Sequence, residues 1–109
     1  MEVDRIEGFI GGWVVGDFDP SKLRMDGAEF SVKYYKAGAS EDWHVHKVAT
    51  EITVIVYGSV RMNGRVLREG DVVTLRPGQG TDFHCLTDTA TAVFKAPSVI
   101  GDKYTRDQA

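Results

Sequence analysis

The chain has 109 residues, which suits one compact domain and leaves little room for two. Its formal net charge is −3 with the histidines counted as neutral, and its basic residues are scattered, which argues against a nucleic-acid partner. The single cysteine, Cys85, excludes an internal disulfide, and no apolar stretch is long enough to span a bilayer, so we expect a cytoplasmic protein with no membrane partner.

The first part of the chain, residues 1–27, is expected to pack on the rest of the fold or on a dimer partner. It begins MEVDRIEGFIGGW, which lacks the long apolar run of a secretory signal. The stretch GFIGGWVVGDF is apolar and would be exposed unless something covers it. The stretch DPSKLR favours one helical turn, which Asp19 could cap and Pro20 could start.

Residues 28–98 have the pattern of short strands. The segments 29–36, 51–58 and 91–96 are rich in the β-branched and aromatic residues that favour a pleated surface. Asn63-Gly64 lies between two short strands and predicts a two-residue hairpin turn. Many short strands separated by turns predict an all-β sandwich or barrel, followed by a loosely held tail over residues 99–109.

Two histidines stand one residue apart in WHVHKVATE. Residues two apart on a strand share a face, so His44 and His46 should point the same way. If the strand that begins at Glu51 pairs with theirs, its carboxylate can face both imidazoles, and such a set suits a divalent transition metal. The alternative is a strand that carries its histidines on the surface or in the core.

The third histidine, His84, lies in TDFHCLTD, and a neighbouring strand could deliver it to the same metal as a further ligand. The alternative is a core histidine bonded to a neighbour. Asp82 would share the face of His84, where it could orient a ligand imidazole or act as a general base. It could equally satisfy the turn amides that follow Gly80.

The spacing of Gly38, His44, His46, Glu51 and Gly58 resembles the first motif of the cupin superfamily at every position. The resemblance covers roughly residues 34–97 and implies a small double-stranded β-helix in one domain, the cupin jelly-roll barrel of the RmlC-like type, over residues 28–98. It also implies that the two histidines and the glutamate are metal ligands, and that a later histidine completes the set.

The second cupin motif matches less closely. The stretch from Pro77 to His84 is two residues longer than the family pattern, and Asp88 stands where the family has an asparagine. A shift of two residues keeps the face of a regular strand but moves His84 along it.

These observations predict a metal-binding single-domain cupin. The favoured function is a metalloenzyme, either an oxygenase or an isomerase or lyase, that acts on a small, oxygen-rich, possibly sugar-like substrate. One divalent transition metal per chain is expected, drawn from Fe, Mn, Ni, Co, Cu and Zn. The alternative is a non-catalytic cupin that binds a sugar or metabolite. Cupins of this size commonly pair, so the resemblance also implies a homodimer.

Overall fold

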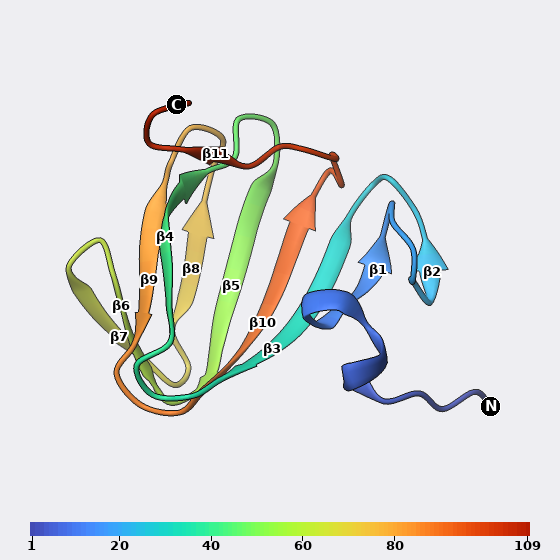
Figure 1. Ribbon diagram of the computed structural model, residues 1–109, viewed down its shortest axis with the longest axis horizontal. Helices are drawn as coiled ribbons and strands as arrows, with labels where there is room; N and C mark the ends of the chain where they lie inside the picture. Colours follow the sequence, from blue (N-terminus) through green and yellow to red (C-terminus); the bar gives the residue numbers. More distant parts are fainter.

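The computed structural model describes residues 1–109 and consists of two β-sheets that face each other (Figure 1). The strands are β1 (Trp13–Gly16), β2 (Leu23–Arg24), β3 (Glu29–Tyr35), β4 (Ser40–Val45), β5 (Thr50–Tyr57), β6 (Ser59–Met62), β7 (Arg65–Arg68), β8 (Val72–Leu75), β9 (Thr81–Cys85), β10 (Thr89–Ala96) and β11 (Tyr104–Thr105). One sheet has the order β2-β1-β3-β10-β5-β8, and the other has the order β11-β4-β9-β6-β7.

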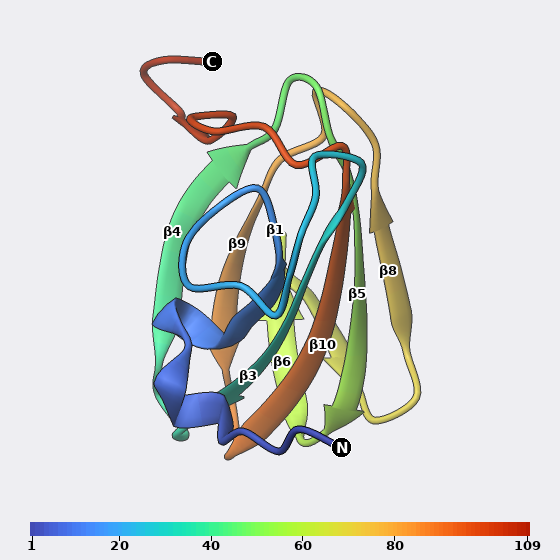
Figure 2. The same ribbon diagram turned by 90° about the vertical axis from the view of Figure 1, so that its right-hand side faces the viewer.

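The two sheets lie on opposite sides of a common interior, with β4 and β9 across from β10, β5 and β8 (Figure 2). No ring of paired strands closes them into a barrel, so the expected barrel is in fact a sandwich of two sheets. The all-β, single-domain jelly roll is as the sequence predicted. The chain contains no helix with the length and apolar composition needed to cross a membrane.

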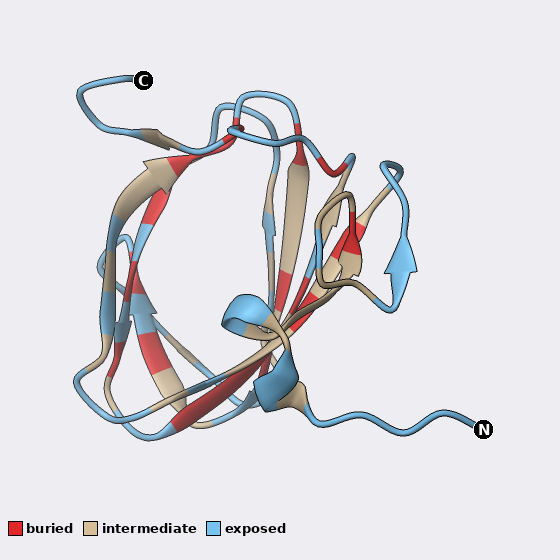
Figure 3. Ribbon diagram, turned by 45° about the vertical axis from the view of Figure 1, so that its right-hand side comes forward, coloured by how far each residue is buried: buried red, intermediate tan, exposed pale blue.

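Side chains alternate along the central strands, as the period of a β-strand requires. On β10, Thr91, Val93 and Lys95 face the interior, whereas Phe94 between them is 43% exposed on the outer face. The buried residues lie mainly on the strands (Figure 3).

The apolar core fills one part of this interior. It is formed by Ile55, Val60, Met62, Phe83 and Cys85, none of which is more than 7% exposed. Burying each of the larger side chains in this set contributes roughly 1.5–3 kcal/mol to the free energy of folding. Two of these residues, Met62 and Phe83, also line the pocket described below, so the core forms part of its wall.

The hairpin between β6 and β7 turns at Asn63-Gly64, as the sequence predicted. Both residues have positive φ, 49° and 76°, and Met62 pairs with Arg65 across the turn. Only a residue pair that tolerates the left-handed region can make this tight connection, which explains the Asn-Gly sequence.

The N-terminal segment differs from expectation in its local structure. Residues 19–24 form no helical turn; instead two short 3₁₀ helices, η1 (Ile6–Gly8) and η2 (Ile10–Gly12), precede β1. β1 pairs with β3 of the same chain, so part of the segment extends the six-stranded sheet. The tail also pairs, because β11 adds to the edge of β4.

Candidate functional site

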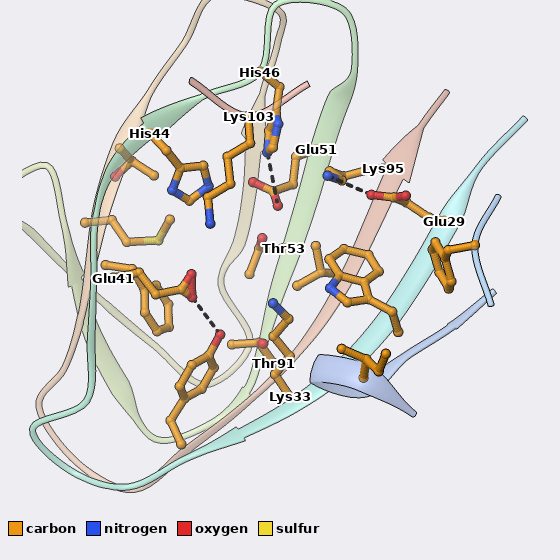
Figure 4. Close-up of a pocket in the computed structure, with 18 of the residues that line it drawn as sticks. Glu29, Lys33, Glu41, His44, His46, Glu51, Thr53, Thr91, Lys95 and Lys103 are labelled. Carbon is orange, nitrogen blue, oxygen red and sulfur yellow. Dashed lines mark hydrogen bonds and ion pairs between the residues drawn. The ribbon is translucent and has the colours of Figure 1, made fainter. Parts of the chain in front are cut away.

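One pocket of about 330 Å³ opens between the two sheets (Figure 4). His44, His46 and Glu51 all line it, from the end of β4, the residue after it and the start of β5. The sequence predicted that Glu51 faces both histidines if the two strands pair. The strands do not pair, because β4 and β5 lie in opposite sheets, but the three side chains still line one pocket between them.

Both histidines are held by backbone carbonyls at Nδ1. The His46 ring donates to the carbonyl of Asp102, and the His44 ring lies 3.3 Å from the carbonyl of Asp42. A carbonyl oxygen can only accept, so the proton sits on Nδ1 and leaves Nε2 with a free lone pair. Burial lowers the pKa of both imidazoles below the ordinary value and outweighs the bonds to the two carbonyls, which raise it; nearby Lys103 lowers the pKa of His44 further. Both rings are therefore neutral near pH 7.

Glu51 faces His46 across the pocket, with 4.0 Å between its Oε1 and Nε2 of the imidazole. Burial raises the pKa of the Glu51 carboxyl, while Lys95, His44 and Lys33 act in the opposite direction. The ring centroids of His44 and His46 are 5.3 Å apart. The three donors thus gather at one end of the pocket (Figure 4).

The chemistry of these donors suits a divalent metal, since neutral imidazoles with a fixed Nδ1–H are the usual form of histidine ligands. Two atoms each about 2.1 Å from one ion can be no more than about 4.2 Å apart, so the separation of Glu51 and His46 is at the limit. No three His, Cys, Asp or Glu side chains converge at ligand spacing as they stand. The pocket therefore offers suitable donors but not a closed ligand set.

His84 and Asp82 lie outside this pocket, contrary to the sequence-based expectation. On β9, Thr81, Phe83 and Cys85 are buried, whereas Asp82 and His84 are exposed on the outer face. The physical reason is that turning Phe83 and Cys85 outward would remove two members of the core. The His84 imidazole therefore cannot join His44 and His46.

The carboxylate of Asp82 has a structural contact instead. It accepts a hydrogen bond of 2.8 Å from the backbone N–H of Asn63, at the turn between β6 and β7. The carboxylate thus fixes a neighbouring turn, which is close to the alternative that the sequence left open.

Three lysines outside the cupin motif also line the pocket: Lys33 on β3, Lys95 on β10 and Lys103 in the tail. Lys95 is paired with Glu29, with 2.7 Å between Nζ and Oε1, and both side chains are largely buried. Burial lowers the pKa of Lys33; Glu41 and Glu51 raise it, while Lys103 and Lys95 lower it again. The signal in the sequence was alternation, because Glu29 and Lys33 share a strand face.

A tyrosine and a glutamate form a further pair in the pocket. The Tyr35 hydroxyl donates a 3.0 Å hydrogen bond to Glu41 Oε2 (Figure 4). Burial raises the pKa of the Tyr35 phenol, and the adjacent Glu41 raises it further, so the hydroxyl stays protonated. The sequence assigned the role of general base to Asp82. Inside the pocket, the pair of Tyr35 and Glu41 is the group that resembles such an acid–base pair.

The tail contributes directly to the site through Asp102. Its carboxylate accepts hydrogen bonds from the backbone N–H groups of Lys47, at 2.8 Å, Val48, at 3.2 Å, and Ala49, at 2.9 Å. Burial would raise the pKa of Asp102, but these three donors outweigh it and hold the pKa below the ordinary value. The segment around Asp102 therefore fixes both the 47–49 loop and the ring of His46.

The comparisons with known proteins find similarity in structure. No protein-family model matches the chain, and no curated protein matches it in sequence. The structure is similar to DMSP lyase DddQ from Ruegeria pomeroyi DSS-3, with a TM-score of 0.71 and 20% identity over 88% of this chain and 50% of that one. The chain thus spans about half the length of DddQ.

Two further structures extend this picture. An uncharacterised conserved protein with a double-stranded β-helix domain from Klebsiella pneumoniae has a TM-score of 0.66 and 18% identity, over 91% of this chain and 87% of that one. Oxalate decarboxylase from Bacillus subtilis, described with Mn(II) centres, has a TM-score of 0.62 and 19% identity, over 74% of this chain and 24% of that one. The chain therefore has the cupin fold, a double-stranded β-helix, as its first motif implied.

Proposed function

We propose that this protein is a metal-dependent enzyme of the cupin fold that acts on a small, oxygen-rich substrate inside the pocket. The observation that carries the proposal is the pair of neutral imidazoles, each fixed at Nδ1 by a carbonyl, that share one small pocket with the Glu51 carboxylate. In this proposal His44, His46 and Glu51 hold one divalent transition metal, with the six candidate metals still open.

A bound metal would act as a Lewis acid or redox centre for a substrate oxygen. The chain's own residues supply the rest. The Glu41 carboxylate can accept a proton from the substrate and return it to the product, and the Tyr35 hydroxyl orients that carboxylate. The names of the similar structures, a lyase and a decarboxylase, support the isomerase or lyase alternative over an oxygenase.

The test compares two histidine variants. With each candidate metal supplied in turn, the wild type should bind about one ion per chain and gain thermal stability, roughly 2.7 kcal/mol at a metal concentration of 100 Kd. His46→Ala should lose both the ion and the gain, because it removes one donor. Elemental analysis and melting curves with and without metal give the two readouts.

The matched control is His84→Ala, which removes an imidazole from the outer face. It should keep the metal content and the stabilisation of the wild type. A His46→Ala protein that still binds one ion, or a His84→Ala protein that has lost it, would refute the proposed ligand set.

A non-catalytic binding cupin is the second candidate. It is favoured by one observation: the carboxylate expected to act as general base, Asp82, lies outside the pocket. A protein that binds a small ligand with no turnover under any supplied metal would match this alternative.

A further inference from the structure

Two of the three pocket lysines make no direct ion pair. Lys95 is neutralised by Glu29, but neither Lys33 nor Lys103 forms an ion pair. The ammonium of Lys33 lies 5.0 Å from the centre of the Trp13 ring, and its side chain is half-buried. The carboxylates of Glu41 and Glu51 act on Lys33 and raise its pKa, but neither forms an ion pair with it, so the half-buried ammonium is left without a direct anionic contact.

A second polar group beside Lys33 also has no partner. Thr91 stands opposite Lys33 in the pairing of β3 with β10, so their side chains are neighbours on one face of the sheet. Thr91 is only 1% exposed, lines the pocket, and its Oγ1 makes no hydrogen bond. Buried hydroxyls are rarely left without a partner. Ser31 Oγ is also unpartnered, but only Thr91 lines the pocket, where an atom of a bound ligand can reach its hydroxyl.

The two groups face the middle of the pocket. Figure 4 shows the Lys33 ammonium and the Thr91 hydroxyl below Thr53, while Lys103 reaches down from the opposite side beside His44. An ammonium and a hydroxyl, both able to donate, match the oxygens of a carboxylate. A volume of about 330 Å³ limits the ligand to a small molecule.

We infer that Lys33 and Thr91 form an anion subsite that binds a carboxylate of the substrate, with Lys103 facing the same ligand from the other side. This inference rests on the proposed function, because it names the substrate class of the same pocket. The substrate is thus a small carboxylic acid whose carboxylate lies at Lys33 and whose reacting oxygen lies toward His44, His46 and Glu51.

The test measures binding of malonate, with the neutral malonamide as its matched probe, to the full chain by calorimetry. The titrations use protein stripped with a chelator and protein loaded with Mn(II). Malonate should bind both forms, and malonamide should bind at least about tenfold more weakly, because a charge-assisted contact is lost.

Three variants test whether Lys33 and Thr91 contact the malonate. Lys33→Gln should weaken malonate binding by about tenfold or more and Thr91→Val by several-fold, while Lys33→Arg should retain part of the affinity. Ser31→Ala is the matched control, because Ser31 Oγ is also buried without a partner but does not line the pocket. It should bind malonate as the wild type does. Circular dichroism checks that each variant is folded. If Lys33→Gln does not fold, Lys103→Gln, a change at an exposed position, tests the subsite in its place.

The possible outcomes distinguish the proposed metal site from the proposed anion subsite. Malonate binding to stripped protein that depends on Lys33, with no metal bound by the wild type, would support the subsite and refute the metal. Normal metal binding with malonate affinity unchanged in Lys33→Gln and Lys103→Gln would overturn the subsite alone. Equal affinity for malonate and malonamide would also overturn it.

Discussion

At the scale of single residues, the pocket is a set of charges that are paired in different ways. Glu29 is matched by Lys95, and Glu41 is bonded to the Tyr35 hydroxyl. Glu51 is the carboxylate that faces the imidazole of His46. Glu51 therefore lies next to the proposed metal and Glu41 next to a proton donor, so the two carboxylates have different roles.

Glu41→Gln should therefore slow turnover while leaving the metal in place. Once a substrate among small carboxylic acids is found, kcat should fall by roughly 10² or more, the usual contribution of a general base. Metal content, measured by elemental analysis, should remain that of the wild type.

The control for this change is Asp82→Asn, which alters a carboxylate on the outer face. Its kcat should match the wild type. The roles assigned here would be reversed if Asp82→Asn lost activity and Glu41→Gln kept it.

The residues found from sequence are those in a motif with fixed local spacing. His44 and His46 could be placed on one face from the period of a strand, and the motif spacing added Glu51. The expected pairing of their two strands was wrong, because β4 and β5 lie in opposite sheets and meet across the pocket. The sequence placed His84 at the metal, but the alternation of the buried Phe83 and Cys85 with polar residues puts His84 on the outer face. Lys103 could not be found, since nothing local predicts that a C-terminal residue reaches the pocket.

At the scale of elements, the C-terminal segment is a structural part of the site. Asp102 binds the 47–49 loop between β4 and β5, and β11 pairs with β4 next to His44. The sequence predicted a loose tail because the segment is short, polar and lacks a strand pattern. Its order comes from one buried carboxylate that satisfies three backbone N–H groups, which composition cannot reveal.

Asp102→Asn should destabilise the protein by about 2 kcal/mol at pH 7, because hydrogen bonds to a charged acceptor are replaced by weaker ones and an amide donor now faces N–H groups. The pKa of Asp102 is lower in the folded state than in the unfolded chain. Its stabilising contribution is therefore complete above the unfolded pKa of about 3.9 and is lost as the pH falls through the folded value.

Urea unfolding of the metal-free protein at pH 7, pH 5 and about pH 3 measures this dependence. The difference between wild type and Asp102→Asn should be similar at the two higher pH values and should shrink at the lowest. A difference that grows on acidification would show that the carboxylate of Asp102 does not stabilise the fold.

At the scale of the whole molecule, the outer face of the six-stranded sheet is apolar. Paired positions on adjacent strands place these side chains side by side: Phe30, Val32, Ile52, Val54, Val72, Ala92 and Phe94. Val72 is 60% exposed and Phe94 is 43% exposed in the single chain. Contiguous apolar surface of this kind marks an interaction site, so we propose that a second copy covers it in a two-fold homodimer.

The sequence left residues 1–27 to pack either on the same chain or on a dimer partner, and β1 of that segment pairs with β3 of the same chain. Sedimentation at micromolar concentration should give twice the 12.0 kDa mass of the chain. Phe94→Lys should shift the protein to monomer, whereas Val66→Lys, at an exposed position on β7 of the other sheet, should not. A wild type that sediments as a monomer would contradict the dimer.

Anomalous diffraction from crystals grown with Mn(II) tests whether one divalent metal binds between His44, His46 and Glu51. We expect a single anomalous peak per chain inside the pocket, about 2.0–2.2 Å from Nε2 of both imidazoles and from a Glu51 oxygen. A pocket without a peak, or a peak on the outer face at His84, would contradict it.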